Sequence, residues 1–427
     1  MPTINDALVN AFLADATYAL GQGVPDGITG GTLKSLLQDR MTLTLAEYVA
    51  GNFTMVTHIE TDDVSGSGFD ATVWRRNSDD KVFVSMQGTE GFADFLVDGD
   101  LTLSGGARAQ LADMVNWWLR IATGVNEAAP QIRSLVFPTV DVNGQLQYFE
   151  FAAPVAGAGL LVGATNLELN GHSLGGHLAT AFARIFGGST AISHISTFNS
   201  AGFTASSEAI FQNLQSLLGM GTSAFPDAAQ QSNYFAKNGL NVTTNTFWFN
   251  QIGERVEVFN EEGTGFPNHY MYRLTDALAL ADAMSKLDAG LSISSFNAIV
   301  GAAANKTDAS FENVLDALRR LFGGASVNST PIGDVEGSAQ SRSEYHANLD
   351  ALVTSTAFQT AVGPLTVSNL ATMATSELLT RTQAANGLAY RYALRELNPF
   401  AVLGPDSLYD GSGSIPSHNA NGELNLY

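Results

Sequence analysis

The sequence contains no cysteine, so disulfide bonds and thiolate metal sites are excluded. The first residues also lack a basic segment followed by an apolar core, so we expect no conventional signal peptide. The most apolar window, residues 152–164, is too short and too rich in glycine to span a bilayer. We therefore expect no transmembrane segment, and a location either outside the cell, reached without a conventional signal peptide, or in the cytoplasm.

Positive charge is scarce, with 20 Lys and Arg residues against 41 Asp and Glu residues and a formal net charge of −21. A surface of this sign repels nucleic acid and anionic lipid at long range, so we expect no nucleic-acid partner. A lipid would have to be captured through apolar contacts. Hydrophobic residues make up 45% of the 427 positions and charged residues 14%, which is the composition of a well-buried globular protein.

Three regions of the chain differ in their patterns. Residues 1–50 carry apolar side chains at spacings of three and four, which predicts an N-terminal helical segment. In residues 51–290 β-rich runs alternate with helical ones, and this predicts an α/β domain with a mostly parallel central sheet flanked by helices. Residues 291–427 predict a mainly helical C-terminal region.

One short segment carries the chemistry. Gly171-His172-Ser173-Leu174-Gly175 matches the pattern G-x-S-x-G, with an expected strand before it and an expected helix after it. Such a turn strains the backbone of a nucleophilic serine, and the two glycines remove side chains that would collide with neighbouring backbone. The N-terminus of a helix stabilises negative charge, so the N–H of Leu174 is expected to face a developing oxyanion. The alternative is an ordinary serine in a glycine-rich turn.

A nucleophilic serine needs a histidine base and a carboxylate that orients the base. In α/β-hydrolases the chain order is nucleophile, acid, histidine. His269 follows in a loop ahead of a long expected helix and is the predicted base. His346, within a helical pattern, is the alternative, and His418 lies in a turn-rich tail. The remaining histidines are set aside by this order or are expected to be packing or surface residues: His58, His172, His177 and His194.

Two segments together resemble the class 3 (fungal-type) triacylglycerol lipase family, in its bacterial branch. They are "NGHSLGGHLA" (170–179) and "VFVSMQGTEGFADFLVDGD" (82–100), and the resemblance covers residues 50–275. It implies an α/β-hydrolase fold in which Gly88-Thr89 supplies a second oxyanion donor, followed by Asp94-Phe95 and Asp98. Gln87 stands where the family has arginine, so the support of this loop departs from the family pattern.

The resemblance also bears on the acid and on substrate access. The family has an apolar strand, a polar step and then its aspartate. Residues 245–253 read as that strand and Glu254 as the acid, with Glu257 as the alternative. The apolar face of residues 203–226 is either a lid that opens at a lipid surface or a core helix that covers the sheet.

These observations predict a hydrolase of carboxylic esters, a lipase, phospholipase or esterase, that acts on a lipid or ester substrate at a lipid–water interface. Ser173, His269 and Glu254 would form the triad, and Thr89 and Leu174 the oxyanion hole. No cofactor and no metal site is indicated, although relatives in the family sometimes bind calcium. An alternative is a lipase-like module of a larger secreted bacterial protein with an adhesion or toxin role. A peptidase or thioesterase on the same scaffold is a third candidate.

Overall fold

The computed structural model describes residues 2–409 apart from residues 62–66, 89–104, 143, 240–242, 244–249, 262–265, 304–308, 325–326, 333–338, 385–386 and 397. A seven-stranded sheet forms the centre of the molecule, in the order β1-β2-β3-β6-β7-β8-β9. The first three strands pair antiparallel, and β3, β6, β7, β8 and β9 pair parallel. The strands are β1 (Phe53–Glu60), β2 (Asp70–Arg76), β3 (Val82–Met86), β6 (Leu167–His172), β7 (Ile192–Phe198), β8 (Gln231–Ala236) and β9 (Glu254–Val258).

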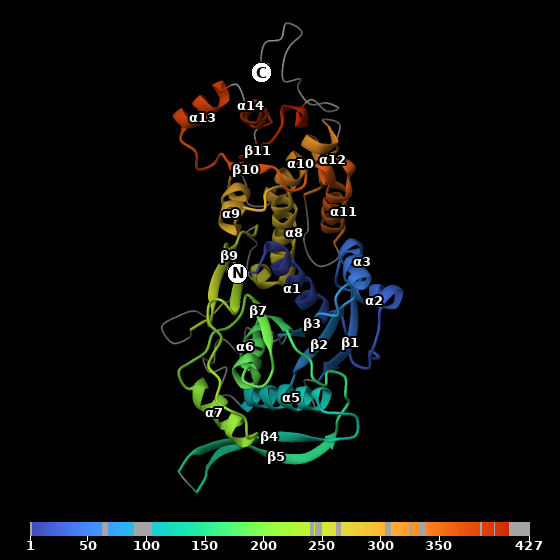
Figure 1. Ribbon diagram of the computed structural model, residues 1–427, viewed down its shortest axis with the longest axis vertical. Coiled ribbons are helices and arrows are strands. Elements are labelled where there is room, and N and C mark those ends of the chain that lie inside the picture. Colours follow the sequence, from blue (N-terminus) through green and yellow to red (C-terminus); the bar gives the residue numbers. More distant parts are fainter. Residues whose placement is uncertain are drawn as a thin grey trace.

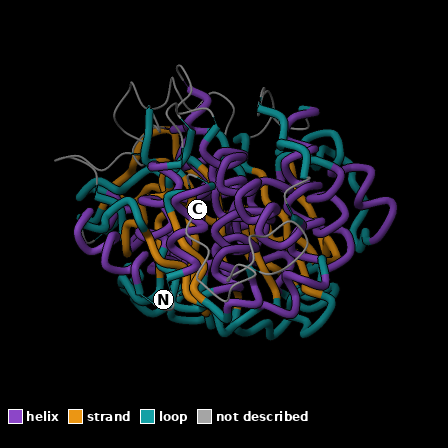
Figure 2. Tube along the Cα trace, turned by 90° about the horizontal axis from the view of Figure 1, so that it is seen from above, coloured by secondary structure: helices purple, strands orange, loops and turns teal. Residues whose placement is uncertain are grey.

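Helices cover both faces of this sheet, as Figures 1 and 2 show. One face packs against α6 (Leu174–Phe186), with α5 (Gly105–Ala122) and α7 (Ser207–Leu217) beside it in the same hydrophobic cluster, and the other face packs against α1 (Ile4–Thr17) and α8 (Met271–Leu287). Alternate side chains of a strand point to opposite faces, so Phe83 joins one hydrophobic cluster and Val84 the other. The predicted fold class is therefore confirmed as an α/β-hydrolase fold.

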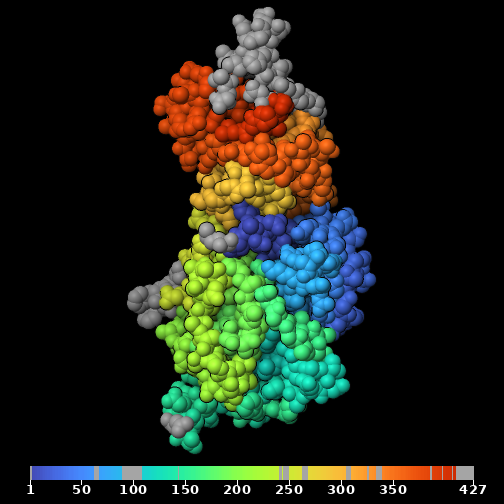
Figure 3. Space-filling model, viewed as in Figure 1, coloured from blue at the N-terminus to red at the C-terminus, as the bar shows by residue number. Residues whose placement is uncertain are grey.

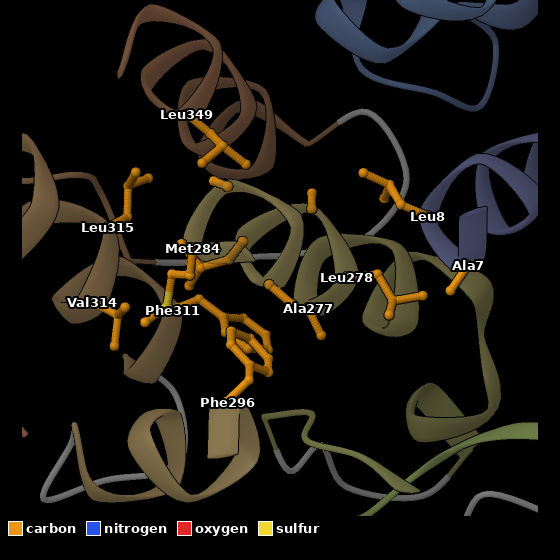
Figure 4. Close-up of a cluster of buried hydrophobic side chains, with 14 of the residues drawn as sticks. Ala7, Leu8, Ala277, Leu278, Met284, Phe296, Phe311, Val314, Leu315 and Leu349 are labelled. Carbon is orange, nitrogen blue, oxygen red and sulfur yellow. The ribbon is translucent and has the colours of Figure 1, made fainter. Parts of the chain in front are cut away.

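The C-terminal helices pack against α8, which lies at the centre of their hydrophobic cluster (Figure 4). Met284 of α8 lies in this cluster with Phe296, Phe311 and Leu349, which come from three later helices. The elements of this region are α9 (Ile293–Ala302), α10 (Ser310–Gly323), α11 (Gln340–Thr354), α12 (Thr356–Ala361), β10 (Thr366–Asn369), α13 (Thr375–Gln383), α14 (Leu388–Arg395), β11 (Phe400–Leu403) and η2 (Asp406–Leu408).

The N-terminal helices belong to the same cluster, because Ala7 and Leu8 of α1 lie beside Leu278 of α8 (Figure 4). Helices α2 (Gly30–Leu37) and α3 (Leu43–Asn52) follow and lead directly into β1. Helix α1 thus lies between the sheet and the C-terminal helices (Figure 1). Within the described residues, no helix is long and apolar enough to cross a membrane.

The last two strands of the central sheet, β8 and β9, differ from the sequence prediction. The expected strand that ends near Gly253 is wrong, since β9 begins at Glu254, and residues 244–249 lie outside the described part of the chain. The sequence did not predict β8. Its residues are largely polar yet buried, and Gln231 and Asn233 form side-chain hydrogen bonds. The segment therefore lacks the apolar run by which a buried strand is recognised in a sequence.

Two elements lie outside the central sheet on the α5 face. The strands β4 (Ala128–Val140) and β5 (Leu146–Ala156) form an antiparallel hairpin on α5, at the lower end of Figure 1. Helix α7 lies within the segment considered as a lid. Its Ile210, Phe211 and Leu214 are fully buried in the cluster shared with α6, which are the contacts of a core helix.

Candidate active site

Ser173 lies in the tight turn between β6 and α6, as the G-x-S-x-G pattern predicts. Its backbone has φ 59° and ψ −126°, a strained conformation for a residue that carries a side chain. A side chain at Gly171 would meet the backbone of Gly175, and one at Gly175 would meet the backbone of Met86. The glycines therefore permit the turn, which holds Ser173 at the N-terminus of α6, where free N–H groups favour an anion.

The imidazole of His269 reaches this serine. Its Nε2 lies 2.9 Å from Ser173 Oγ, and both residues are buried. His269 ends the short helix η1 (Phe266–His269), just ahead of α8, which matches the expected loop position. A neutral imidazole nitrogen at this distance can accept the serine proton, so the pair has the geometry of a nucleophile and its base.

The backbone of His269 is fixed by two donors. Asn199 Nδ2 and His172 Nε2 both bind the His269 carbonyl oxygen, at 2.9 Å and 2.7 Å. A carbonyl oxygen only accepts, so His172 must carry its proton on Nε2. Burial, reinforced by the neighbouring His269, lowers the pKa of His172 well below its usual value, so this ring is neutral. The residue beside the nucleophile is therefore neither a surface group nor simple packing.

The other ring nitrogen of His172 binds the first part of the chain. Its Nδ1 lies 2.8 Å from the hydroxyl of Tyr18, which directly follows α1. With the proton of His172 on Nε2, Tyr18 donates to Nδ1 and accepts the N–H of Gly88 at 3.0 Å. Burial raises the pKa of Tyr18, so the phenol keeps its proton. We call Gly88, Tyr18, His172 and the His269 carbonyl the Tyr18 network.

Gly88 follows β3 and lies directly against the nucleophile turn. A side chain at this position would come within 2.8 Å of Ser173 Cβ and 3.1 Å of the Leu174 nitrogen. The backbone after β3 therefore runs beside the N–H of Leu174, where a second oxyanion donor is expected. Thr89 lies outside the described residues, as do Asp94, Phe95 and Asp98.

The structure does not bring Glu254 to the Ser173–His269 pair. Glu254 is the first residue of β9 and is paired through β8 and β7 with the level of Asn170, three residues before Ser173. Because these strands are parallel, its position is about 10 Å from the edge that carries the serine. Glu257 forms an ion pair with Lys237 at 2.8 Å, and both side chains are largely exposed. The expected strand ended near Gly253, whereas β9 runs from Glu254 to Val258, so the end of the strand was predicted about five residues too early.

His346, the alternative base, lies elsewhere. It is buried on α11, and its Nε2 binds Asp276 Oδ1 of α8 at 2.7 Å, beside the Arg342–Asp276 ion pair. His58 and His194 are strand residues bound to Thr72 and Ser232, and His177 stacks on Phe203. His418 lies outside the described residues. No sequence signal marked Tyr18 or Asn199, since their contacts join segments far apart in the chain.

The fold and this geometry define the class as an α/β-hydrolase fold with a serine and a histidine paired at a nucleophile turn. Among the described residues, no group of three or more His, Asp or Glu side chains could hold a metal ion. No protein-family model matches the chain, and no curated protein matches it significantly in sequence.

Solved structures similar to this chain include two structures of a lipase. One is the Lip2 lipase from Yarrowia lipolytica, with a TM-score of 0.33 and 13% identity, over 60% of this chain and 78% of that one. The other is the nonglycosylated Yarrowia lipolytica LIP2 lipase, with a TM-score of 0.31 and 12% identity, over 60% of this chain and 79% of that one.

Proposed function

We propose that this protein is a serine hydrolase of carboxylic esters, with a lipid ester as its substrate. The observation that carries the proposal is the 2.9 Å approach of His269 Nε2 to Ser173 Oγ at a strained turn that opens a helix. Strain of this kind persists only where the surrounding structure holds it, and it gathers at functional sites. The lipid class follows the resemblance of "NGHSLGGHLA" to the class 3 lipases.

The geometry suits a two-step acyl transfer. Ser173 Oγ attacks the ester carbonyl while His269 takes the hydroxyl proton, and the carbonyl oxygen becomes an oxyanion. The N–H of Leu174 and a donor from Thr89 would bind that oxyanion; removing one such donor typically slows an enzyme about 10²–10³-fold. The intermediate collapses to an acyl-serine, and His269 gives its proton to the leaving alcohol. Water activated by His269 then releases the acid and restores the serine.

The test is turnover of p-nitrophenyl esters together with covalent labelling by a fluorophosphonate. Replacing Ser173 by Ala should lower kcat/KM by about 10⁴-fold or more and abolish the label, because the attacking oxygen is gone. The variant His269→Ala should lower both kcat/KM and the extent of labelling to a similar degree. Mapping the adduct by mass spectrometry should place it on Ser173.

His346→Ala is the matched control, since it removes another buried histidine far along the chain. After correction for the folded fraction, it should keep its label and its turnover. Equal turnover by wild type and Ser173→Ala would refute the proposal. A label that survives the loss of His269 but is lost with His346 would instead transfer the role of base to His346.

A further inference from the structure

The described residues of the hairpin tip, 135–142 and 144–147, expose an unusual amount of apolar surface. The exposed fractions of Val136, Phe137 and Val142 are 80%, 81% and 101%, and Val140 and Leu146 are also more than half exposed. Soluble proteins usually expose large apolar side chains singly, and a gathered set marks an interaction surface. Asp141 is the only charged residue in the tip, and the tip contains no Lys or Arg.

The tip is a formed structure and not a loose loop. The Asp141 carboxylate accepts the N–H of Gln145 at 2.8 Å, and the Gly144 N–H binds the Asp141 carbonyl at 3.0 Å, which closes the turn. The strand pairing shifts between Ser134 and Thr139, so a bulge turns Val136 and Phe137 out of the ladder. Apolar side chains are therefore held outward by a defined backbone.

Contacts along α5 place the tip at the active-site edge of the sheet. Ile132 binds Asn116, and further along the hairpin the Tyr148 ring lies 5.9 Å from the Arg108 guanidinium, so the hairpin runs back toward the N-terminal end of α5. That end is also beside Gly68, which precedes β2 at the edge where β3 ends. The tip extends beyond it and protrudes at the lower end of Figure 3.

The composition of the hairpin favours a lipid surface over a second copy of this chain. Pro130 and Pro138 in β4 and Pro154 in β5 have no N–H group, which disfavours pairing of these strands with another chain. An aromatic ring and branched aliphatic side chains insert well into the boundary between headgroups and acyl chains. The absence of basic residues from the tip and the net charge of −21 indicate a neutral or zwitterionic surface.

We infer that the hairpin tip inserts into neutral or zwitterionic lipid surfaces and anchors the protein there, with the Ser173 edge toward the lipid. The inference deepens the proposed function and rests on it for the identity of the substrate. Its anchor is separate from α7, whose apolar face is buried. The tip would bring the enzyme to lipid that its net charge does not attract.

The experiment measures binding of the full chain carrying Ser173→Ala, which cannot turn over lipid, to phosphatidylcholine vesicles by co-sedimentation. Replacing Val136, Phe137 and Val142 by Ser should weaken the partition by about tenfold or more, because most of the inserted apolar area is lost. The matched control replaces Val162, Ile332 and Leu379, also exposed but away from the tip, by Ser. This control should bind as the parent does.

Because the chain has no cysteine, a single label reports insertion directly. An environment-sensitive dye on the variant Val142→Cys should shift to the blue with phosphatidylcholine vesicles, and the same dye on Leu379→Cys should not. Vesicles rich in phosphatidylglycerol should bind more weakly at low salt. Equal binding by the parent and the tip variant, or a tip label that responds only to self-association, would overturn the inference.

Turnover separates this inference from the proposed function. On a water-soluble ester the tip variant should keep its kcat/KM within about twofold, while its rate on emulsified triglyceride should fall by about tenfold. A wild type that turns over no ester but binds vesicles through the tip would remove the proposed function alone. A wild type that turns over soluble ester but binds no vesicles would remove the anchor alone.

Discussion

Ser173 and His269 are held in place by different kinds of contact. The serine is fixed by its own strained backbone and by the glycines that permit close approach of Met86 and Gly175. The histidine is fixed through its carbonyl oxygen, which takes hydrogen bonds from Asn199 and His172. Such backbone anchoring holds the ring in reach of the serine, and a carboxylate partner would add control of its tautomer.

The position of Glu254 leads to a prediction for a single residue. It lies at the start of β9 and lines a cavity of about 440 Å³ with Pro2, Thr3 and Ser232. Because Glu254 lies about 10 Å from the serine edge of the parallel strands, we expect Glu254→Gln to keep kcat within about twofold of wild type in ester turnover. Glu257→Gln is the companion variant, with the same expected result. A loss of about 10³-fold or more in Glu254→Gln, with folding intact, would restore the residue as the acid of the triad.

Helix α1 takes part in the site, although it precedes the sheet in the chain. Its Asn10 accepts a hydrogen bond from Asn170 of β6 at 3.0 Å, in the buried layer beneath the nucleophile strand. This contact and the packing of α1 on α8 set the position of Tyr18, which joins the backbone after β3 to His172. The Tyr18 network thus links the expected oxyanion loop to the base.

Removing the hydroxyl group of Tyr18 tests the role of the Tyr18 network. Tyr18→Phe leaves the Gly88 N–H and His172 Nδ1 without their partner, at a cost of about 1–3 kcal/mol per buried group. We expect kcat to fall by about tenfold with KM almost unchanged, since the oxyanion loop and the base act in the transition state. The same change at the half-exposed Tyr48 of α3 is the control. An unchanged kcat, or a fall that matches the unfolded fraction from a thermal melt, would contradict this role.

Elements with a clear pattern within a short stretch of sequence were predicted correctly. The apolar periodicity of α1, the helix expected after His269 (α8) and the G-x-S-x-G turn are properties of short segments, and the structure contains all of them. Strand β8 was missed because its buried residues are polar and satisfied by partners such as Thr180. Tyr18 and Asn199 were missed for a related reason: their partners, His172 and His269, are distant in sequence, and only the folded sheet brings them together.

Across the whole molecule, the end of the central sheet and the C-terminal helices meet at a buried pair of carboxyl groups. Glu261 follows β9, and its carboxylate accepts the N–H of Phe311 in α10 at 3.1 Å. The carboxyl group of Glu312, also on α10, lies beside it, while Arg273, Asp276 and Arg342 lie around the pair. Burial raises the pKa of Glu261 to about 7, and burial together with Glu261 raises the pKa of Glu312 to about 8.

These shifts make the attachment of the C-terminal helices sensitive to pH. Both pKa values are above the ordinary 4.5, so the folded protein binds protons that the unfolded chain releases. Their stabilisation is complete below about pH 4.5 and is lost as the pH rises through 7 and 8. We expect the midpoint of thermal unfolding, followed by circular dichroism, to fall by a few degrees from pH 6 to pH 9, and the variant Glu312→Gln to flatten this fall. Glu47→Gln, at an exposed position of α3, should keep the wild-type slope. An equal slope in Glu312→Gln and wild type would contradict this prediction. Replacing the carboxyl group by an amide would then have removed no group that titrates between pH 6 and pH 9.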